Sequence, residues 1–330
     1  VYESYLIFDH KKEKIVIVED NIYSGREEEE QKAALQEVLA DLKKQAVDEF
    51  SERDLHTLTF RNHLEEATFK DMVTKAKKFI RQGDMFQCVL SQRFSADISG
   101  KPLDFYRNLR ITNPSNYLYF YDFGDYQIIG ASPESLVSLK NGVVTTNPIA
   151  GTRPRGANDQ KDKDLSEELL SDVKEVAEHR MLVDLGRNDI GKIAEVGSVQ
   201  VSKYMEVEFF RYVMHLTSVV KGKLLSGLTG MDALKSTLPA GTVSGAPKIR
   251  AMKRIYELEK EKRGIYAGAI GYLSASGDMD FAIAIRTMII KNQKAYVQAG
   301  AGIVYDSVPE NEYYETINKA KAMTRIGEIQ

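Results

Sequence analysis

The spacing of apolar and polar residues along the chain predicts an alternation of short strands and helices. Apolar runs at residues 5–8 and 15–18 predict two strands. The acidic start of the segment 26–44 predicts a helix there, because acidic side chains stabilise the first helical turn. Further along, a helix is expected to end near Gly83, and a strand is expected over residues 86–95.

The same pattern divides the chain into two parts. Residues 47–67 contain few regularly spaced apolar side chains, so we expect a linker there. The first residue, Val1, is not an initiator methionine. We therefore expect residues 1–67 to be the remnant of a longer N-terminal region, and residues 68–330 to form one larger domain.

Hairpins dominate the second half of the chain. Two apolar runs flank Asn141-Gly142, a strong signal for a two-residue hairpin turn. A meander over residues 264–305, with turns near 276–277 and 292–293, is expected to join three antiparallel strands. This pattern favours an α+β fold in which large antiparallel sheets pack on each other and are flanked by helices.

Glu134 and Thr152 are predicted to meet at the open end of the first hairpin. Pairing outward from its turn places residues 132–134 beside residues 149–150, so the two side chains should lie within roughly 10 Å, given a rise of ~3.3 Å per residue. A carboxyl group and a hydroxyl there would suit acid–base chemistry. The alternative interpretation is an ordinary solvent-facing hairpin mouth.

The segment 147–156 is suited to contact a ligand. Gly151 allows the backbone to approach a bound molecule closely, and two prolines stiffen the segment. Arg153 and Arg155 offer planar forks that fit carboxylates or phosphates. The alternative interpretation is a basic surface turn.

Two Glu-x-x-Glu pairs on separate helices form a candidate magnesium site. Glu175 and Glu178 belong to a predicted helix over residues 164–185, and Glu312 and Glu315 belong to the C-terminal helix. A spacing of three places each pair on one helix face, and Mg²⁺ takes carboxylate oxygens. The alternative is a solvated acidic surface. The apolar side of the first helix is predicted to consist of Leu165, Leu169, Val173, Val176 and Ala177.

Three further features belong to the second half of the chain. Tyr266, Arg286 and the glycine-rich run 300–302 are expected to cluster and to hold a small carboxylate, although an ordinary sheet edge is the alternative. The loop 241–248 lacks the spacing of a nucleotide phosphate loop. His215 lies in an apolar run, where a lone histidine is commonly a core residue.

Composition excludes several classes of protein. The 330 residues are 43% hydrophobic and 28% charged with net charge −3, so a basic surface for nucleic acid or membranes is not expected. No apolar run is long enough to span a membrane. The single cysteine, Cys88, excludes an internal disulfide, fits a cytoplasmic location and is expected in the core.

These motifs, in this order, resemble the chorismate-utilising enzymes and, within that family, the large subunits of anthranilate synthases. The resemblance covers essentially the whole chain and makes residues 68–330 the expected chorismate-binding catalytic domain. The matching segments are residues 131–134, 148–156, 174–189, 213–215, 241–250, 266–268, 285–286, 298–302 and 312–319.

Two positions distinguish branches of the family. Where this chain has Ala150, enzymes that make 4-amino-4-deoxychorismate for folate carry a lysine that bonds to the ring. Where it has Gln87, the isochorismate and salicylate enzymes carry a lysine that activates water. Neither side chain here is a nucleophile or a base, so the resemblance implies ammonia as nucleophile and anthranilate as product.

The resemblance also implies roles for individual residues. Glu178 and Glu315 would bind Mg²⁺ directly, and Glu175 and Glu312 would bind it through water. Glu134 would be the general acid for the ring hydroxyl, and His215, with Thr152, would assist proton transfer. The implied substrate-binding residues are Gly151, Thr152, Thr242, Tyr266, Arg286, Gly300, Ala301, Gly302 and Lys319.

Partners and alternatives follow from the same resemblance. Ammonia would come from glutamine through a separate amidotransferase subunit, in the first step of tryptophan synthesis. The alternatives are 4-amino-4-deoxychorismate synthase, isochorismate or salicylate synthase, or an inactive truncated module that binds the amidotransferase subunit.

Tryptophan-binding members carry Leu-Leu-Glu-Ser and Asn-Pro-Ser-Pro-Tyr-Met segments. This chain lacks the first and departs from the second at residues 113–118, so we expect millimolar tryptophan not to inhibit it.

Overall fold

The computed structural model describes residues 2–44, 58–210, 213–324 and 327–329 of the chain. It contains two compact units, Val1–Ser51 and Glu52–Gln330. The first unit consists of an antiparallel hairpin and a helix, as the sequence predicted. Its elements are β1 (Ser4–Asp9), β2 (Lys14–Glu19) and α1 (Glu28–Lys43).

The expected linker is partly wrong. Residues 45–57 lie outside the described part, but β3 (Leu58–Asn62) follows directly and pairs with two other strands of the larger unit. Leu58 and Phe60 alternate with polar residues and are fully buried. A pattern of only two apolar positions is too short to predict a strand from the sequence. The burial of both side chains shows that this segment belongs to the larger unit.

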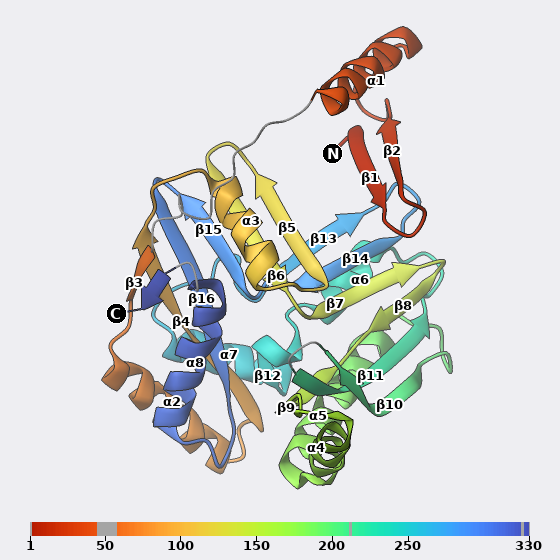
Figure 1. Cartoon of the computed structure of the whole chain (residues 1–330). Helices are drawn as coiled ribbons and strands as arrows, with labels where there is room; N and C mark the ends of the chain where they lie inside the picture. The colour runs from red at the N-terminus through yellow and green to blue at the C-terminus, as the bar shows by residue number, and fades with distance from the viewer. Residues whose placement is uncertain (1, 45–57, 211–212, 325–326, 330) are drawn as a thin grey trace. The chain divides into compact units, whose positions relative to one another are not determined.

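Two large sheets form the framework of that unit (Figure 1). The described part of the first sheet has seven strands and that of the second has eight. Neighbouring strands are antiparallel except β17 and β3. The seven-stranded sheet contains β10 (Gln200–Phe209), β11 (Val213–Lys223), β8 (Val143–Thr146), β7 (Ser135–Lys140), β14 (Met279–Ile283), β13 (Ala269–Leu273) and β9 (Ile149–Pro154). The eight-stranded sheet contains β17 (Gly327–Ile329), β3, β4 (Gln87–Asp97), β16 (Lys294–Ile303), β15 (Thr287–Lys291), β6 (Tyr126–Ser132), β5 (Tyr117–Asp122) and β12 (Gly245–Ala246).

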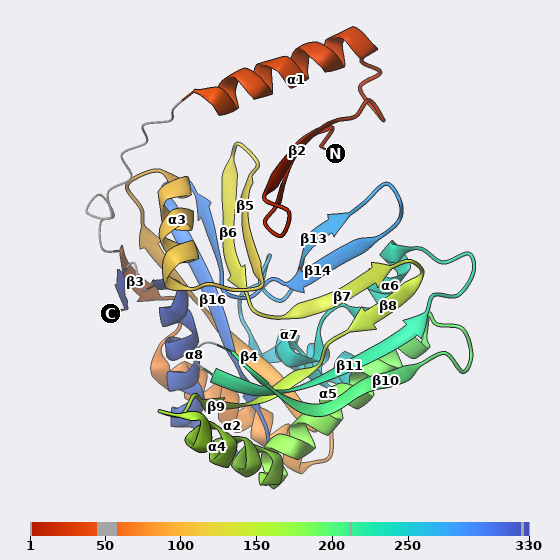
Figure 2. The ribbon, with the colours of Figure 1, turned by 45° about the vertical axis from the view of Figure 1, so that its right-hand side comes forward.

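Helices flank both sheets, which confirms the predicted α+β class (Figure 2). The helices beside the eight-stranded sheet are α2 (Glu66–Arg81), α3 (Pro102–Thr112), α7 (Lys248–Leu258) and α8 (Pro309–Thr324). Those beside the seven-stranded sheet are α4 (Asp159–Ser171), α5 (Val173–Gly191) and α6 (Gly230–Thr237). The short 3₁₀ helix η2 (Gly241–Val243) contacts α5 and the strands β4, β12 and β16 of the eight-stranded sheet. No described helix is long and apolar enough to cross a membrane.

The first predicted hairpin is confirmed, but its continuation is not. Strands β7 and β8 pair through a turn at Asn141-Gly142, where both residues have positive φ. Beyond that hairpin, β9 pairs with β11 and not with the segment before β7. The predicted pairing of residues 132–134 with 149–150 is therefore wrong, because the chain beyond β8 continues along β11, which pairs with both β8 and β9.

The meander also differs from the prediction. Residues 269–303 form four strands, and the hairpin β13–β14 belongs to one sheet while β15–β16 belongs to the other. The chain passes between the sheets at residues 284–286, and Arg286 has φ of 50° there. This left-handed backbone is rare for a residue with a side chain and is commonly found at functional sites.

The predicted helix over residues 164–185 is two helices. Asp172 ends α4 and caps α5 by accepting hydrogen bonds from the backbone of Lys174 and Glu175. The break changes the helix periodicity, so Val173 is exposed and does not lie on the apolar side. His179 is fully buried, and its Nε2 lies 2.6 Å from Ser218 Oγ.

Candidate active site

His215 and Thr152 lie opposite each other on β11 and β9, next to a bulge in their pairing. His215 Nδ1 is 3.0 Å from Thr152 Oγ1 and 3.1 Å from the carbonyl oxygen of Gly151. Because a carbonyl oxygen only accepts, Nδ1 carries the proton and Nε2 keeps its lone pair. Burial lowers the pKa of His215, so the neutral imidazole can accept a proton at neutral pH.

Glu134 and Thr242 form a second pair of functional side chains. Thr242 Oγ1 donates a hydrogen bond of 2.8 Å to Glu134 Oε1. Burial raises the pKa of Glu134 to about 7, against the lowering effects of Thr242, Lys319 and Arg286. A carboxyl group with this pKa carries a proton at neutral pH much of the time, which is what a general acid requires.

Tyr266, Arg286 and Gly300 come together as the sequence predicted. The charge of Arg286 acts on both Tyr266 and Glu134, and the Tyr266 hydroxyl lies 2.6 Å from where a Cβ on Gly300 would be. Only glycine leaves room for the phenol at this position. Burial lowers the pKa of Arg286 and raises that of Tyr266, so both are desolvated groups suited to hold a carboxylate.

The four glutamates of the predicted magnesium site interact through their charges. Burial raises the pKa of Glu178, and the charges of Glu175 and Glu315 raise it further. Burial also raises the pKa of Glu312, again with a contribution from Glu315. Across the described residues, however, no three acidic, histidine or cysteine side chains approach closely enough to enclose a metal ion. The two helices therefore bring the carboxylates together without forming a closed coordination shell.

Two polar side chains border these carboxylates. Lys319 Nζ lies 2.7 Å from Glu315 Oε1 and donates a hydrogen bond of 3.1 Å to the Gly300 carbonyl oxygen. Gln87 Nε2 lies 3.4 Å from Glu178 Oε1. Gln87 Oε1 is buried without a hydrogen-bond partner among the described residues, which leaves a free acceptor beside the carboxylates.

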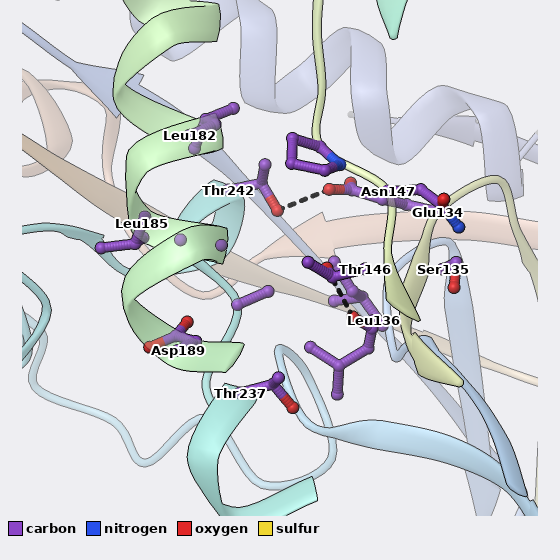
Figure 3. A pocket seen from close by; sticks show the side chains of 15 residues that line it. Glu134, Ser135, Leu136, Thr146, Asn147, Leu182, Leu185, Asp189, Thr237 and Thr242 are labelled. Carbon is purple, nitrogen blue, oxygen red and sulfur yellow. Dashed lines mark hydrogen bonds between the residues drawn. The ribbon is translucent and has the colours of Figure 1, made fainter. Parts of the chain in front are cut away.

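A small cavity of about 50 Å³ lies behind Glu134 (Figure 3). Glu134 and Thr242 lie toward one end, and Asp189 and Thr237 toward the other. The cavity is large enough for ordered water, which a proton-exchanging carboxyl group can use. A larger cavity of about 300 Å³ includes Tyr266 but not the other catalytic candidates.

Several predicted contacts are different in the structure. Arg153 is not free for a ligand, because it contacts Glu168 at 3.0 Å, Asp172 at 2.8 Å and Glu175 at 3.5 Å. Arg155 is likewise paired with Asp162. The guanidinium groups of the two arginines therefore hold the segment 147–156 to α4 and α5, which is a structural role.

Some residues around the site were not found from the sequence. Asp189 lines the small cavity and contacts Lys248 Nζ at 2.6 Å, across 59 positions of sequence. Asn147 and Ser135 also line the cavity. The Asp-Leu-Gly-Arg-Asn-Asp segment could have indicated Asp189, but nothing local predicts that the lysine at the start of α7 reaches it.

Comparisons with known proteins identify the class. A model of the chorismate binding enzyme family matches residues 1–325. Component 1 of anthranilate synthase from Lactococcus lactis is 56% identical over 328 residues, which cover 99% of this chain and 72% of that protein. The chain belongs to the chorismate-binding enzyme family, which confirms the resemblance found in the sequence and makes the chain a chorismate-utilising enzyme of the lyase class.

Two solved structures from different branches of the family match this chain to different degrees. The crystal structure of anthranilate synthase component I from Streptococcus pneumoniae matches with a TM-score of 0.93 and 71% identity, over 98% of this chain and 73% of that one. A putative 2,3-dihydroxybenzoate-specific isochorismate synthase from Bacillus anthracis matches with a TM-score of 0.72 and 28% identity, over 82% of this chain and 74% of that one. The similarity to anthranilate synthase component 1 is therefore much the greater.

Proposed function

We propose that this chain catalyses the anthranilate synthase reaction, in which chorismate and ammonia give anthranilate, pyruvate and water. The observation that carries the proposal is the arrangement of proton-transfer groups. A carboxyl group with pKa about 7 on Glu134 and a neutral imidazole on His215 both lie within the electrostatic reach of Arg286. An acid, a base and a cation around one site suit a dianionic substrate that must lose a hydroxyl group and a ring proton.

Substrate binding would use the buried cations and the glycine-rich strand. Arg286 and Tyr266 would hold the enolpyruvyl carboxylate, since both are desolvated and have free donors. The backbone of residues 300–302 would lie against the ring. Ala301 is fully buried, so its contact with substrate would come from the backbone and not from the methyl group.

The chain's own residues would then move the protons. Glu134 would protonate the ring hydroxyl, which leaves as water, while ammonia adds to the ring carbon beside the carboxylated one. His215 Nε2 would take the ring proton as the C–O bond to the enolpyruvyl group breaks and the ring becomes aromatic, and would return that proton to the departing enolate, which becomes pyruvate. Thr152 would keep the imidazole oriented through its 3.0 Å contact with Nδ1.

Magnesium fits the remaining carboxylates. Burial and the charges of neighbouring glutamates raise the pKa values of Glu178 and Glu312, so a divalent cation would relieve this repulsion. When bound, the metal neutralises the ring carboxylate of chorismate and acts as a Lewis acid. We propose Glu178 and Glu315 as direct ligands, with Glu175 and Glu312 acting through water.

Gln87 and Ala150 support ammonia as the nucleophile. The free Oε1 of Gln87 can accept a hydrogen bond from ammonia, and neither an amide nor a methyl group can activate water as a base. Ala150 lies on β9, next to Gly151, and cannot bond covalently to the ring. These two side chains favour anthranilate over isochorismate or 4-amino-4-deoxychorismate.

Product fluorescence tests the proposal directly. The chain is incubated with chorismate, ammonium and Mg²⁺, and parallel reactions contain a chelator or omit ammonium. We expect anthranilate only in the complete reaction. Product separation by chromatography distinguishes anthranilate from 4-amino-4-deoxychorismate and isochorismate. Turnover that is absent in the complete mixture, or that yields either of the other two products, would contradict the proposal.

A further inference from the structure

The small cavity behind Glu134 extends from the proposed general acid to a buried ion pair. Glu134 and Thr242 lie toward one end of the cavity, and Asp189 and Thr237 lie toward the other (Figure 3). The cavity has a volume of about 50 Å³. One ordered water needs roughly 10–15 Å³, so more than one water molecule fits there. The polar side chains at the two ends would give such waters hydrogen-bond partners.

Asp189 and Lys248 form the ion pair at the far end. Asp189 Oδ2 lies 2.6 Å from Lys248 Nζ, and the two side chains are only 9% and 11% exposed. Lys248 Nζ also donates a 2.9 Å hydrogen bond to the carbonyl oxygen of Thr237, which lines the cavity. Burial lowers the pKa of Lys248, against the raising effect of Asp189, so this ammonium group releases its proton more readily than an exposed lysine.

Lys192 connects this ion pair to solvent. Its Nζ lies 3.0 Å from Asp189 Oδ1, and its side chain is 58% exposed. The two oxygens of Asp189 therefore contact two different lysines, one that is buried and one that can exchange protons with water. Asp189 itself lines the cavity, so it lies between the solvent-exposed lysine and the interior of the cavity.

A structural role alone does not explain this arrangement. The ion pair does join the end of α5 to the start of α7. Apolar side chains of similar size would commonly serve that purpose as well, because removing two charges from water offsets much of their attraction. A polar cavity beside the pair also forfeits packing contacts that a purely structural contact would keep.

Glu134 loses one proton in each turnover of the proposed reaction. That proton leaves with the ring hydroxyl as water when the C–O bond breaks, and a carboxylate remains. His215 would not replace it, because the proton that His215 takes returns to the departing enolate. The nitrogen releases one proton after the C–N bond forms, so the uptake of one proton by Glu134 keeps the overall reaction balanced. Bound substrate would cover the side of Glu134 that faces the active site, whereas the cavity reaches the carboxyl group from behind.

We propose that Asp189 and Lys248 form a proton relay that recharges Glu134 through water in the cavity. The Glu134 carboxylate takes a proton from a cavity water, which regains one from Lys248 through Asp189, and each transfer breaks one O–H or N–H bond and forms another. The neutral Lys248 then regains a proton from solvent through Lys192 and Asp189. Both relay residues are positioning residues, since they act through Glu134. This inference rests on the proposed function, because only a general acid that has given up its proton needs to regain one.

Lys248→Arg tests the relay while it keeps the ion pair. Arginine stays charged and can bond to Asp189, but it does not give up its proton. We expect kcat with ammonium as nitrogen source to fall roughly 10²-fold, as for loss of an assisted proton transfer. The ratio kcat/KM for chorismate should stay within about twofold of wild type. This ratio reports only the steps up to the irreversible loss of the hydroxyl group, and recharging comes later.

Imidazole buffer supplies a measurement that a merely structural role would not change. In Lys248→Arg and in Lys248→Met, kcat should rise with imidazole concentration at constant pH and ionic strength, because a small acid can replace the missing donor. Wild-type kcat should not respond. Lys235→Arg is the matched control, since Lys235 is exposed and pairs with Asp232 at 4.0 Å on α6. It should leave kcat, kcat/KM and the response to imidazole unchanged.

The outcomes separate the relay from the proposed function. A wild-type chain that makes no anthranilate from ammonium contradicts the proposed function itself. Wild-type kcat in both Lys248 variants overturns only the relay and shows that Glu134 is recharged from the active-site side. Equal losses of kcat and kcat/KM without a response to imidazole also overturn it, because they indicate structural damage.

A variant of the cavity lining decides the question if both Lys248 variants fail to fold. Ala240 lines the cavity, so Ala240→Val adds two methyl groups there and leaves the ion pair in place. We expect it to displace water and to lower kcat several-fold without lowering kcat/KM, again with recovery in imidazole. Wild-type kcat in a folded Ala240→Val chain would overturn the relay.

Discussion

The two sides of the active site are built differently. One side, which we call the strand side, consists of His215, Thr152, Glu134 and Thr242. There Thr152 is hydrogen-bonded to His215 and Thr242 to Glu134, so these polar groups already have partners. On the helix side, carboxylates of α5 and α8 repel one another, and only Lys319 contacts Glu315 within the described site. The strand side is preorganised for proton transfer, whereas the carboxylates of the helix side repel one another and would be stabilised by the proposed cation.

This difference predicts that turnover falls most when a carboxylate of the helix side is removed. Glu315→Ala removes one of two proposed direct ligands, and we expect Mg²⁺-dependent turnover to fall by roughly 10³-fold or more, since metal assistance is worth several kcal/mol. Thermal unfolding should be unchanged or slightly improved, because a repelling charge is removed. Steady-state fluorescence over a range of Mg²⁺ concentrations measures the effect.

The matched control is Glu310→Ala on the same helix. Glu310 is exposed and contacts only Lys70, at 3.7 Å, among the described ion pairs. Its loss should leave Mg²⁺ dependence unchanged. Wild-type rates in Glu315→Ala would remove this residue from the metal site.

Glu134→Gln tests the strand side and should have the next largest effect. Loss of a general acid typically lowers turnover by about 10²- to 10⁴-fold. In the wild type, activity should fall as pH rises through about 7, because Glu134 loses its proton there. The residual activity of Glu134→Gln should lack this decline, as measured by kcat/KM against pH.

The same variant has a stability signature with a definite sign. The pKa of Glu134 is raised in the folded state, so its contribution to stability is complete below about 4.5 and is lost as pH rises through about 7. Urea unfolding of Glu134→Gln should therefore show a smaller decrease in unfolding free energy across this range than the wild type. Identical pH dependence in both proteins would contradict a buried, protonated Glu134.

The sequence could predict the features that depend on local backbone geometry, but not those that depend on packing between distant segments. Asn141-Gly142 determines a hairpin by local backbone geometry, and the alternation around it was read correctly. The partner of β9 is set by packing over 60 residues away, so the pairing of residues 149–150 was predicted wrongly. Asp172 looks like one acidic position among several, and only the structure shows that it ends one helix and caps the next.

The same distinction between local geometry and distant packing applies to the individual site residues. Tyr266 and Arg286 could be placed together because they flank the β13–β14 hairpin, whose turn fixes the pairing of the segments on either side of it. The contact between Asp189 and Lys248 could not be predicted, because no local pattern links the end of α5 to the start of α7, 59 residues later. The roles of the glutamates came from the family resemblance and stay a prediction; burial and neighbouring carboxylates raise the pKa values of Glu178 and Glu312.

Ala150→Lys should have a moderate effect and tests the branch. The new amine would enter β9 beside Gly151 and Thr152, where it would compete with ammonia for the ring. We expect about a tenfold decrease in anthranilate formation, as for loss of one well-placed interaction, and a protein–substrate adduct visible by mass spectrometry. Gln87→Lys is the comparison variant and should instead permit some isochorismate. An unchanged rate without an adduct would show that position 150 does not face the substrate.

Thr242→Val should have the smallest effect and separates positioning from catalysis. Thr242 donates to Glu134 Oε1 and lowers the pKa of that carboxyl group, so its loss should raise the pKa and move the alkaline decline in activity to higher pH. Turnover at neutral pH should fall only about two- to tenfold, as expected for one hydrogen bond. Thr237→Val is the control, because Thr237 lines the same cavity but its hydroxyl bonds to carbonyl oxygens of α6. If both variants shift the pH profile equally, the shift comes from the cavity, and Thr242 does not tune Glu134.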